Sequence, residues 1–396
     1  MSNTKRDVQR LLDIYRAAKL HQYAPLARNK PWGINDNCVF VDPNEGYVVM
    51  YAPTSTGGTL RISSKYDAET RGFCARQSTH KAMYDALRQG HMNADPSTLG
   101  TNLRDVAAAR TVANGTMDQF ADSRAVAQIK IDDALRTKLR NVFGFAAAVS
   151  TSGRAQVPSW LSSVLIDLTA QKMVATDGSS LCTVRIDPPE WNVFAPPEAI
   201  ANHQQFLLSA EFVRLLLSKD VGAVALSLRA SKDHKWAYAL SDHTRITERL
   251  STYVYPDYRR VIPRVDGRYE AWVKIVDPHC AELKRYIGRC RAEKRQPLLR
   301  LALSLNGQML WAYEHVDTGY GPLLAIGDVK PVDTPCLAPR LHAGVGLDAK
   351  RLLHALQTLD GYVSIFIPVD RRENRWESWM FTTDDYVVVV APVRID

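Results

Sequence analysis

The feature that most constrains the fold is a strand–helix pattern that the sequence repeats about 140 residues apart. The first copy begins with the alternating residues 128–131 and continues into an amphipathic helix that Asp132 can cap. The second copy begins at residues 272–275 and continues into a helix that Asp277 can cap. A chain of 396 residues with such a repeat is expected to form several similar domains instead of one large core.

A second pattern follows each of these helices at a similar interval. Residues 207–228 and 346–367 both read as a helix cap, a helix with a Leu-Leu pair, a short turn and an alternating strand. The start of the chain suggests a third copy, where residues 4–19 predict a helix without a leading strand and residues 78–90 add a further helical stretch. We therefore predict three similar domains, at residues 1–127, 128–262 and 263–396.

Short strand patterns fill the sequence between the helices. Residues 162–168 and 386–395 are typical strand segments, and turn signals such as Asn306-Gly307 separate runs of this kind. Helices isolated among antiparallel strands are typical of an α+β fold and not of a wound parallel sheet. We expect two helices per domain, packed on antiparallel sheets.

The chain is basic, with a formal net charge of +8 at pH 7. Such a charge favours a polyanionic partner such as nucleic acid, although many basic soluble proteins have no such partner. The cations lie off the apolar stripes that are expected to pack, and in the helix after Asp277 this stripe is Leu283, Ile287 and Cys290. Either the helices have ordinary solvated faces, or they present one basic surface to DNA. The residues expected to face DNA are Arg6, Arg10, Arg136, Lys138, Arg140, Arg214, Arg285, Arg289, Lys350 and Arg351.

The sequence contains no motif that predicts catalysis or a metal site. The six cysteines are scattered and are expected to be reduced, packed thiols, and the histidines lack the spacing of metal ligands. The adjacent carboxylates Asp132-Asp133 and Asp384-Asp385 fit a helix start and a turn better than acid–base chemistry. Residues 54–58 are not a phosphate loop, because no Gly-Lys-Ser/Thr follows them. We expect a protein that is not an enzyme and that holds no cofactor.

The sequence also lacks membrane and secretion signals. It has no apolar stretch near the roughly 18 residues that a membrane helix needs. Its first residues are charged and lack the apolar centre of a secretory signal. We expect the protein to stay in the cytoplasm.

Three segments resemble one known family. Residues 174–181 (VATDGSSL) are similar to the ATDGHRL segment of bacterial DNA polymerase III beta subunits, the beta sliding clamps. Residues 255–263 (YPDYRRVIP) resemble the family's FPDYRRVLP segment, and residues 386–395 (YVVVVAPVRI) resemble its terminal VVMPMRL. The segments occur in the family's order and at nearly its spacing. The resemblance covers residues 128–396, whereas residues 1–127 share only the length and an opening helix.

This resemblance implies a DNA clamp fold with three clamp domains per chain, and two chains joined head to tail in a ring. The family's helices line the ring and its sheets form the outer wall. Such a ring slides on double-stranded DNA without reading its sequence, needs an ATP-driven clamp loader, and places the protein at the bacterial nucleoid. A surface pocket binds short peptides of DNA polymerase and other DNA enzymes. Carried over by motif, its residues are Leu161, Thr176, Gly178, Ser179, Ser180, Leu181, Pro256, Arg260, Val261, Val389, Val390, Pro392, Val393 and Arg394.

The sequence departs from the family pattern at this pocket. Ser179-Ser180 replace the family's His-Arg, Ala391 and Val393 replace two methionines, and Asp396 adds a charge after the usual end. Methionine adapts its shape readily, so smaller and stiffer residues predict a changed or narrower set of partners. The departures favour a copy carried by a phage, a plasmid or an integrated element over a chromosomal housekeeping gene.

The function predicted from these features is that of a processivity factor in DNA replication. A homodimeric ring would tether a replicative polymerase to DNA through contacts with phosphates. The alternative is a clamp-fold interaction protein, or decoy, that does not close a ring and binds host replication factors, because ring closure needs residues 1–127, where the match is weakest. A basic protein that binds DNA by its surface would explain the charge but not the three segments.

Overall fold

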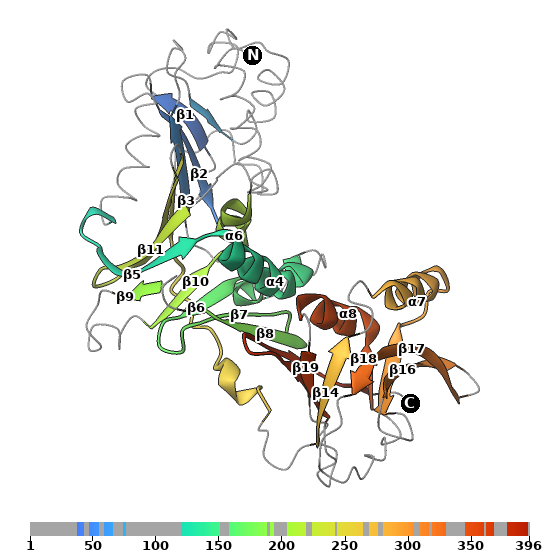
Figure 1. Cartoon of the computed structure of the whole chain (residues 1–396). Helices are drawn as coiled ribbons and strands as arrows, with labels where there is room; N and C mark the ends of the chain where they lie inside the picture. Colours follow the sequence, from blue (N-terminus) through green and yellow to red (C-terminus); the bar gives the residue numbers. More distant parts are fainter. Residues whose placement is uncertain are drawn as a thin grey trace. The chain divides into compact units, whose positions relative to one another are not determined.

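Antiparallel strands carry the fold of this protein, and helices lie in the connections between them (Figure 1). The fold is therefore α+β, as the sequence predicted. The computed structural model describes residues 38–42, 47–54, 59–65, 74–76, 120–150, 158–187, 191–193, 204–218, 224–241, 244–263, 269–275, 280–303, 309–316, 319–329, 345–359, 362–367 and 378–394. The chain divides into two compact units: Met1–Phe143, Gly153–Met173 and Ile186–Tyr255 form the first, and Gly144–Ser152, Val174–Arg185 and Pro256–Asp396 form the second.

The first unit contains a nine-stranded antiparallel sheet in the order β4-β1-β2-β3-β13-β12-β11-β5-β9. A further antiparallel pair, β10 with β6, belongs to the same unit. The elements are β1 (Cys38–Asp42), β2 (Tyr47–Pro53), β3 (Thr59–Lys65), β4 (Cys74–Arg76), β5 (Arg124–Ile131), η3 (Ser159–Ser162), β6 (Val164–Asp167), β9 (Trp191–Val193), β10 (Gln205–Leu208), α6 (Ala210–Leu217), β11 (Val224–Ala230), β12 (Lys235–Leu240) and β13 (Thr244–Arg249).

The second unit contains antiparallel strands in the order β8-β21-β20-β19-β14-β17-β16-β15-β18-β22. Two elements, α4 (Asp133–Ser150) and β7 (Lys172–Thr176), contribute residues to both units. The other elements are β8 (Ser180–Arg185), η4 (Tyr258–Arg260), β14 (Tyr269–Ile275), α7 (Ala281–Ala292), β15 (Leu298–Leu303), β16 (Met309–Val316), β17 (Gly319–Val329), β18 (Val345–Asp348), α8 (Ala349–Thr358), β19 (Tyr362–Ile367), β20 (Trp379–Thr382), β21 (Tyr386–Val390) and β22 (Val393–Arg394).

The two strand–helix copies recognised in the sequence have the same strand pairing. In the first copy, β5 precedes α4 and pairs with β11, the strand that follows α6. In the second copy, β14 precedes α7 and pairs with β19, the strand that follows α8. The strands before the second helices also correspond, because β10 pairs with β6 and β18 pairs with β15. The predicted helices at 4–19 and 78–90 lie outside the described residues, and the three-domain division stays a prediction.

The last strand of each copy pairs with a strand from an earlier part of the chain. β13 ends the β11-β12-β13 meander and pairs with β3, whereas β21 ends the β19-β20-β21 meander and pairs with β8.

β8 is the third strand after α4, and β17 is the third strand after α7. β14 pairs with only three residues of β17, Gly327, Asp328 and Val329, and no described strand pairs with that edge over residues 319–326. This open edge of β17 therefore corresponds to the edge of β8 that β21 covers.

Local hydrogen bonds explain where three of the helices begin. A carboxylate oxygen of Asp132 accepts from the backbone N–H of Leu135 at 2.9 Å, as predicted for the α4 cap. The Ser209 hydroxyl caps α6, and Asp348 caps α8 by accepting from the first N–H groups of the helix. The helix after Asp132 is amphipathic, as predicted, because Leu135 and Val142 are completely buried whereas Arg140 is exposed.

Helix α7 differs from the sequence prediction in its start and in its packing face. It begins at Ala281, four residues beyond Asp277, and follows Cys280 in the left-handed conformation with φ of 50°. Tyr286 is buried on the packing face, whereas Ile287 is only partly buried. Burial of a tyrosine requires a partner for its hydroxyl, and Tyr286 donates to the Leu298 carbonyl at 2.8 Å. The strand that provides this partner could not be inferred from the helix sequence.

Candidate functional site

The turn between β7 and β8 has a conformation fixed by its own side chains. An oxygen of Asp177 accepts hydrogen bonds from the N–H groups of Ser179 at 2.8 Å and Ser180 at 2.5 Å. The Thr176 hydroxyl donates to the Ser180 carbonyl at 2.6 Å and accepts from the Gly178 N–H at 3.1 Å. Gly178 has φ of 86°, a left-handed conformation that glycine adopts without steric cost. These bonds give a rigid turn at one of the three segments singled out in the sequence.

The C-terminal segment lies directly beside this turn. β21 pairs with β8 so that Val389 is opposite Leu181, and the Ala391 N–H donates to the Ser179 carbonyl at 2.8 Å. Beyond that bond the chain forms β22, which pairs with β18. Two segments that are about 200 residues apart in the sequence therefore form one structure.

The predicted pocket residues of these two segments differ in exposure. Leu181 and Val389 are each 4% exposed, and Ser180 and Val390 are buried as well. The segment after β21 is more accessible, because Pro392 and Val393 are half-buried. The predicted pocket residues on the paired strands β8 and β21 are therefore buried, and the more accessible ones come from the turn and from the residues after β21.

From Pro256 onward the third segment belongs to the same unit, and local contacts of Asp257 fix its conformation. The Asp257 carboxylate accepts from the Arg259 N–H at 3.3 Å and binds the Arg260 guanidinium at 3.2 Å. Val261 follows with 55% of its surface exposed, which is unusual for a valine. Pro256 is also exposed. Leu161, which was assigned to the same pocket from the sequence, belongs to η3 of the first unit.

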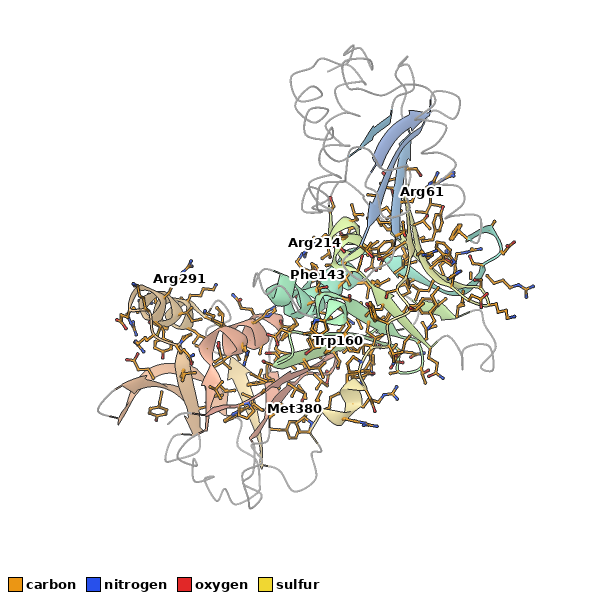
Figure 2. The ribbon with its side chains drawn as sticks, turned by 180° about the vertical axis from the view of Figure 1, so that it is seen from behind. Arg61, Phe143, Trp160, Arg214, Arg291 and Met380 are labelled. Atoms are coloured by element: carbon orange, nitrogen blue, oxygen red, sulfur yellow. The ribbon has the colours of Figure 1, made fainter. Side chains whose placement is uncertain are left out.

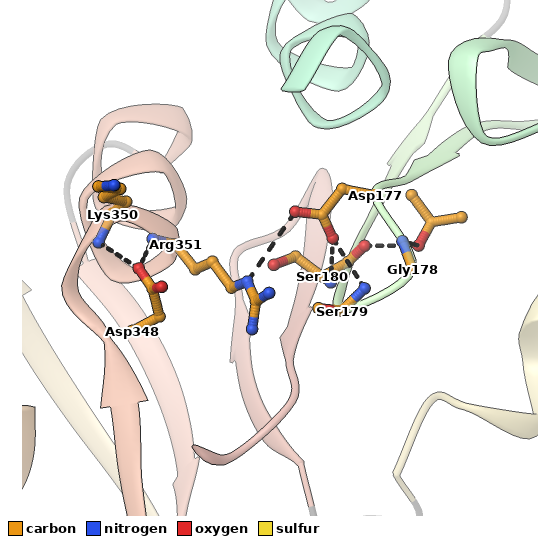
Figure 3. Close-up of polar contacts among 8 residues, drawn as sticks. Asp177, Gly178, Ser179, Ser180, Asp348, Lys350 and Arg351 are labelled. Carbon is orange, nitrogen blue, oxygen red and sulfur yellow. Dashed lines mark hydrogen bonds and ion pairs between the residues drawn. The ribbon is translucent and has the colours of Figure 1, made fainter. Parts of the chain in front are cut away.

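Helix α8 contacts the β7–β8 turn through charge. The second carboxylate oxygen of Asp177 lies 4.0 Å from Nε of Arg351, as Figure 3 shows. Arg351 sits in the first turn of α8, where Asp348 accepts from the N–H groups of Lys350 and Arg351. Asp177 therefore holds its own turn with one oxygen and faces α8 with the other. The sequence places Asp177 within one of the three segments but gives no sign of this second contact.

One turn further along α8, His354 packs against α4. Its ring stacks on Phe145 with 4.1 Å between the ring centroids. A β-carbon at Gly144 would overlap the imidazole, so glycine is what allows the two helices to approach here. Burial lowers the pKa of His354, and the nearby Asp177 carboxylate partly opposes that shift. Burial therefore favours the neutral form of the imidazole.

Several of the cations predicted to face DNA are already paired. Lys138 lies 3.6 Å from Asp187, and Arg214 lies 3.9 Å from Glu211 with its guanidinium over the Phe143 ring. Figure 2 shows Arg214 beside Phe143. Arg140 and Lys350 are exposed, Arg136 is half-buried, and Arg6 and Arg10 lie outside the described residues. On α7, Arg285 pairs with Glu282, and Arg289 lies 3.5 Å from Glu314.

The part of the chain that the structure describes contains no group of three His, Cys, Asp or Glu side chains placed to hold a metal ion. Among those same residues, no helix is both long enough and apolar enough to cross a membrane. Cys182, Cys280 and Cys290 are buried and none of the three forms a disulfide bond, in agreement with the prediction of packed, reduced cysteines.

Comparison with known proteins gives a match at the level of structure. No protein-family model matches the chain, and no curated protein sequence matches it. The DNA polymerase sliding clamp of Pseudomonas aeruginosa is similar over 98% of both chains, with 14% identity and a TM-score of 0.56. The DNA polymerase III beta subunit of Thermotoga maritima is similar over 99% of this chain and 98% of that chain, with 12% identity and a TM-score of 0.60. The Helicobacter pylori beta clamp bound to a DNA ligase peptide is similar over 99% of both chains, with 12% identity and a TM-score of 0.58.

These matches span nearly the whole length of the chain, whereas the resemblance in sequence covered residues 128–396. The antiparallel strands with helices in the connections between them agree with the clamp fold that the resemblance implied. The chain has the fold of the bacterial DNA polymerase III beta subunit, the beta sliding clamp.

Proposed function

We propose that the protein is a sliding clamp, in which two copies close a ring around duplex DNA and hold DNA enzymes on it. The observation that carries this proposal is the open edge of β17. Within the chain, β3 is covered by β13 and β8 is covered by β21. The corresponding edge of β17 has no such partner among the described strands over residues 319–326. A second copy of the chain can supply the missing strand from its N-terminal part, and the first copy can do the same in return.

The basic character of the chain supports duplex DNA as the partner of this ring. The net charge is +8, and exposed cations such as Arg140 and Lys350 lie on helices. Contacts between cations and phosphates provide affinity without sequence information, which a clamp that moves along DNA needs. The role we propose is therefore binding and tethering, with no catalytic step.

The proposed attachment point for partner enzymes is the surface around the β7–β8 turn. The turn and the residues after β21 lie side by side, and the segment with the exposed Val261 belongs to the same unit. The H. pylori clamp with the same fold was solved with a DNA ligase peptide bound, which supports a peptide as the ligand. The partners would be a DNA polymerase and a clamp loader, and the setting would be the bacterial nucleoid.

The mass of the protein in solution tests ring closure. A ring of two copies should scatter light as a particle of about twice 44.3 kDa at micromolar concentration. A particle of one chain mass over the whole concentration range would contradict the proposed ring.

One observation favours the alternative of a clamp-fold protein that does not close a ring. Pro322 lies within the open edge strand β17 and has no N–H to donate. Proline on an edge strand weakens pairing with a further strand. A protein of one chain mass that still binds a replication factor would support this decoy role instead.

A further inference from the structure

Two glycines lie inside helices of the second unit, and only one is explained by packing within the chain. Gly144 of α4 makes room for His354. Gly288 of α7 is exposed, and a β-carbon built there would meet no atom within 4 Å. Glycine in a helix interior is less stable than alanine by about 0.5–1 kcal/mol, and the fold of this chain gains nothing in return at Gly288. The absence of a side chain at Gly288 is therefore useful only to a binding partner that approaches the helix from outside.

The charges around Gly288 identify the side of α7 from which such a partner would come. Lys284 precedes Gly288 by four residues and Arg291 follows it by three, so the three residues form one stripe along the helix. Lys284 and Arg291 are exposed and have no acidic partner in the described part of the chain. Figure 2 shows Arg291 on the side of α7 that is turned away from the strands. The stripe is thus a cationic surface that has no side chain at its centre.

The neighbouring pair of arginines on α7 is occupied by intramolecular contacts. Arg285 pairs with Glu282, which lies one turn before it. Arg289 shares Glu314 of β16 with Arg295, and both guanidinium groups lie over the Tyr286 ring, at 5.9 and 5.4 Å from its centroid. These contacts hold the two arginines beside carboxylates, so they are less available to bind phosphate than the unpaired cations are.

We propose that the stripe formed by Lys284, Gly288 and Arg291 is the phosphate-contacting surface of α7. The inference rests on the proposed function and identifies where the sugar–phosphate backbone of duplex DNA meets this helix. Lys284 and Arg291 are separated by about 10 Å along the helix axis, given a rise of about 1.5 Å per residue. Gly288 lets the DNA backbone come close between them, and the two long side chains bind the phosphates on either side.

The test compares two double variants of the full-length protein that remove the same charge from the same helix. K284Q/R291Q changes the stripe, and R285Q/R289Q is the matched control. Binding of each to a fluorescent duplex of about 30 base pairs is measured by anisotropy at several salt concentrations. We expect the slope of the logarithm of the association constant against the logarithm of the salt concentration to become smaller in magnitude by about 2 for K284Q/R291Q, because each phosphate contact contributes about 0.9. The change for the control should be less than half of that. Equal changes in the two variants, or a larger change in R285Q/R289Q, would overturn the assignment.

A steric variant tests Gly288 without changing any charge. Leucine is a better helix former than glycine, so G288L should fold at least as well as the wild type. We expect the affinity of G288L for duplex DNA to fall several-fold, which is about the loss caused by removing one phosphate contact. G288A should have an intermediate effect. Wild-type affinity in G288L would refute close approach at this position. A wild-type protein without salt-dependent DNA binding would instead refute the proposed function, so the two failures can be told apart.

Discussion

Asp177 illustrates how a single side chain can serve two elements. One of its oxygens fixes the turn after β7, and the other faces Arg351 of α8 (Figure 3). The bonds to the turn are short and local, whereas the ion pair is 4.0 Å long and only partly shielded from water. We therefore expect the turn to depend strongly on the acceptor oxygen and weakly on the charge.

Replacing Asp177 with asparagine separates these two contributions, because asparagine keeps an acceptor oxygen and loses the charge. D177N should lower the free energy of unfolding by less than about 1 kcal/mol, whereas D177A, which leaves N–H groups without an acceptor, should lower it by about 1–3 kcal/mol. Urea unfolding measures both. R351Q is the matched control and should resemble D177N. Equal losses in D177N and D177A would show that the charge, and not the acceptor, holds the turn.

Glu248 of β13 is a buried carboxyl group that makes the first unit sensitive to pH. One of its oxygens accepts from the Ser209 N–H at 3.3 Å, at the start of α6. Burial raises the pKa of Glu248 to about 8, and the nearby Glu211 adds to the shift while hydrogen bonds from Ser209 and Thr54 oppose it. The folded state therefore binds this proton more tightly than the unfolded state, in which the carboxyl titrates near 4.5.

The sign of the resulting pH dependence follows from this raised pKa. The contribution of Glu248 to stability is fully present below about pH 4.5 and is lost as the pH rises through about 8. In E248Q that dependence should disappear, so the variant should gain stability relative to the wild type as the pH rises from about 5 to 8. Unfolding curves across this range measure the difference. Parallel pH profiles of the two proteins would place the carboxyl in contact with water.

At the scale of elements, sequence reasoning succeeded where the signal was local. The apolar period of α4 and the acidic cap at Asp132 were both correct, because each depends on residues within a few positions. The start of α7 was wrong, because the left-handed conformation of Cys280 leaves no mark in the sequence. The partner of Arg289 could not be foreseen either, since Glu314 comes from a different strand.

The candidate site was predictable in its parts but not in its assembly. The three segments were found by resemblance, and their turn and cap residues behave as their types suggest. What joins two of them is the pairing of β21 with β8, a long-range contact that no local pattern encodes. Leu181 is buried within that pairing, whereas Val261 follows η4 and is exposed, and this difference could not be inferred beforehand.

The contact between α4 and α8 depends on glycine at position 144. G144A places a methyl group into the His354 ring and should lower the free energy of unfolding by about 1–3 kcal/mol. The same change made in an H354A background should cost much less, because the ring that it meets is gone. Urea unfolding of the four proteins gives this double-mutant cycle. An equal cost of G144A in both backgrounds would mean that the clash is relieved elsewhere.

The short strand β22 should matter more for partner binding than for folding. It contains only two residues and pairs with β18. Deleting residues 392–396 removes it together with the accessible Pro392 and Val393, so affinity for a short hydrophobic clamp-binding peptide should fall by about 2 kcal/mol. The melting temperature should change little. Deletion of residues 395–396 alone is the control, and fluorescence polarisation that shows equal affinity for both truncations would remove this segment from the peptide site.

For the whole molecule, a closed ring predicts that retention on DNA depends on the shape of the DNA. Protein placed on a circular duplex by a clamp loader should stay bound in salt concentrations that abolish contacts with phosphate. Cutting the circle once should then release it, because the ring slides off the end. Gel filtration before and after cutting measures this difference. Equal loss from circular and linear DNA would show that the protein holds DNA only by its surface.

In the proposed ring, the open edge of β17 would also determine which wrong assemblies the chain can form. An edge that joins a different edge of the next copy makes a heterologous contact. Further copies then add in the same way unless the rotation between successive copies closes the assembly into a ring. A half-turn per copy ends the process at two, whereas any other rotation leads to larger rings or to a helical filament. Pro322 within this strand has no N–H to donate and so weakens every junction at this edge, the proposed one included. Filaments, and not amorphous precipitate, are therefore the expected product of variants in which the junction angle has changed.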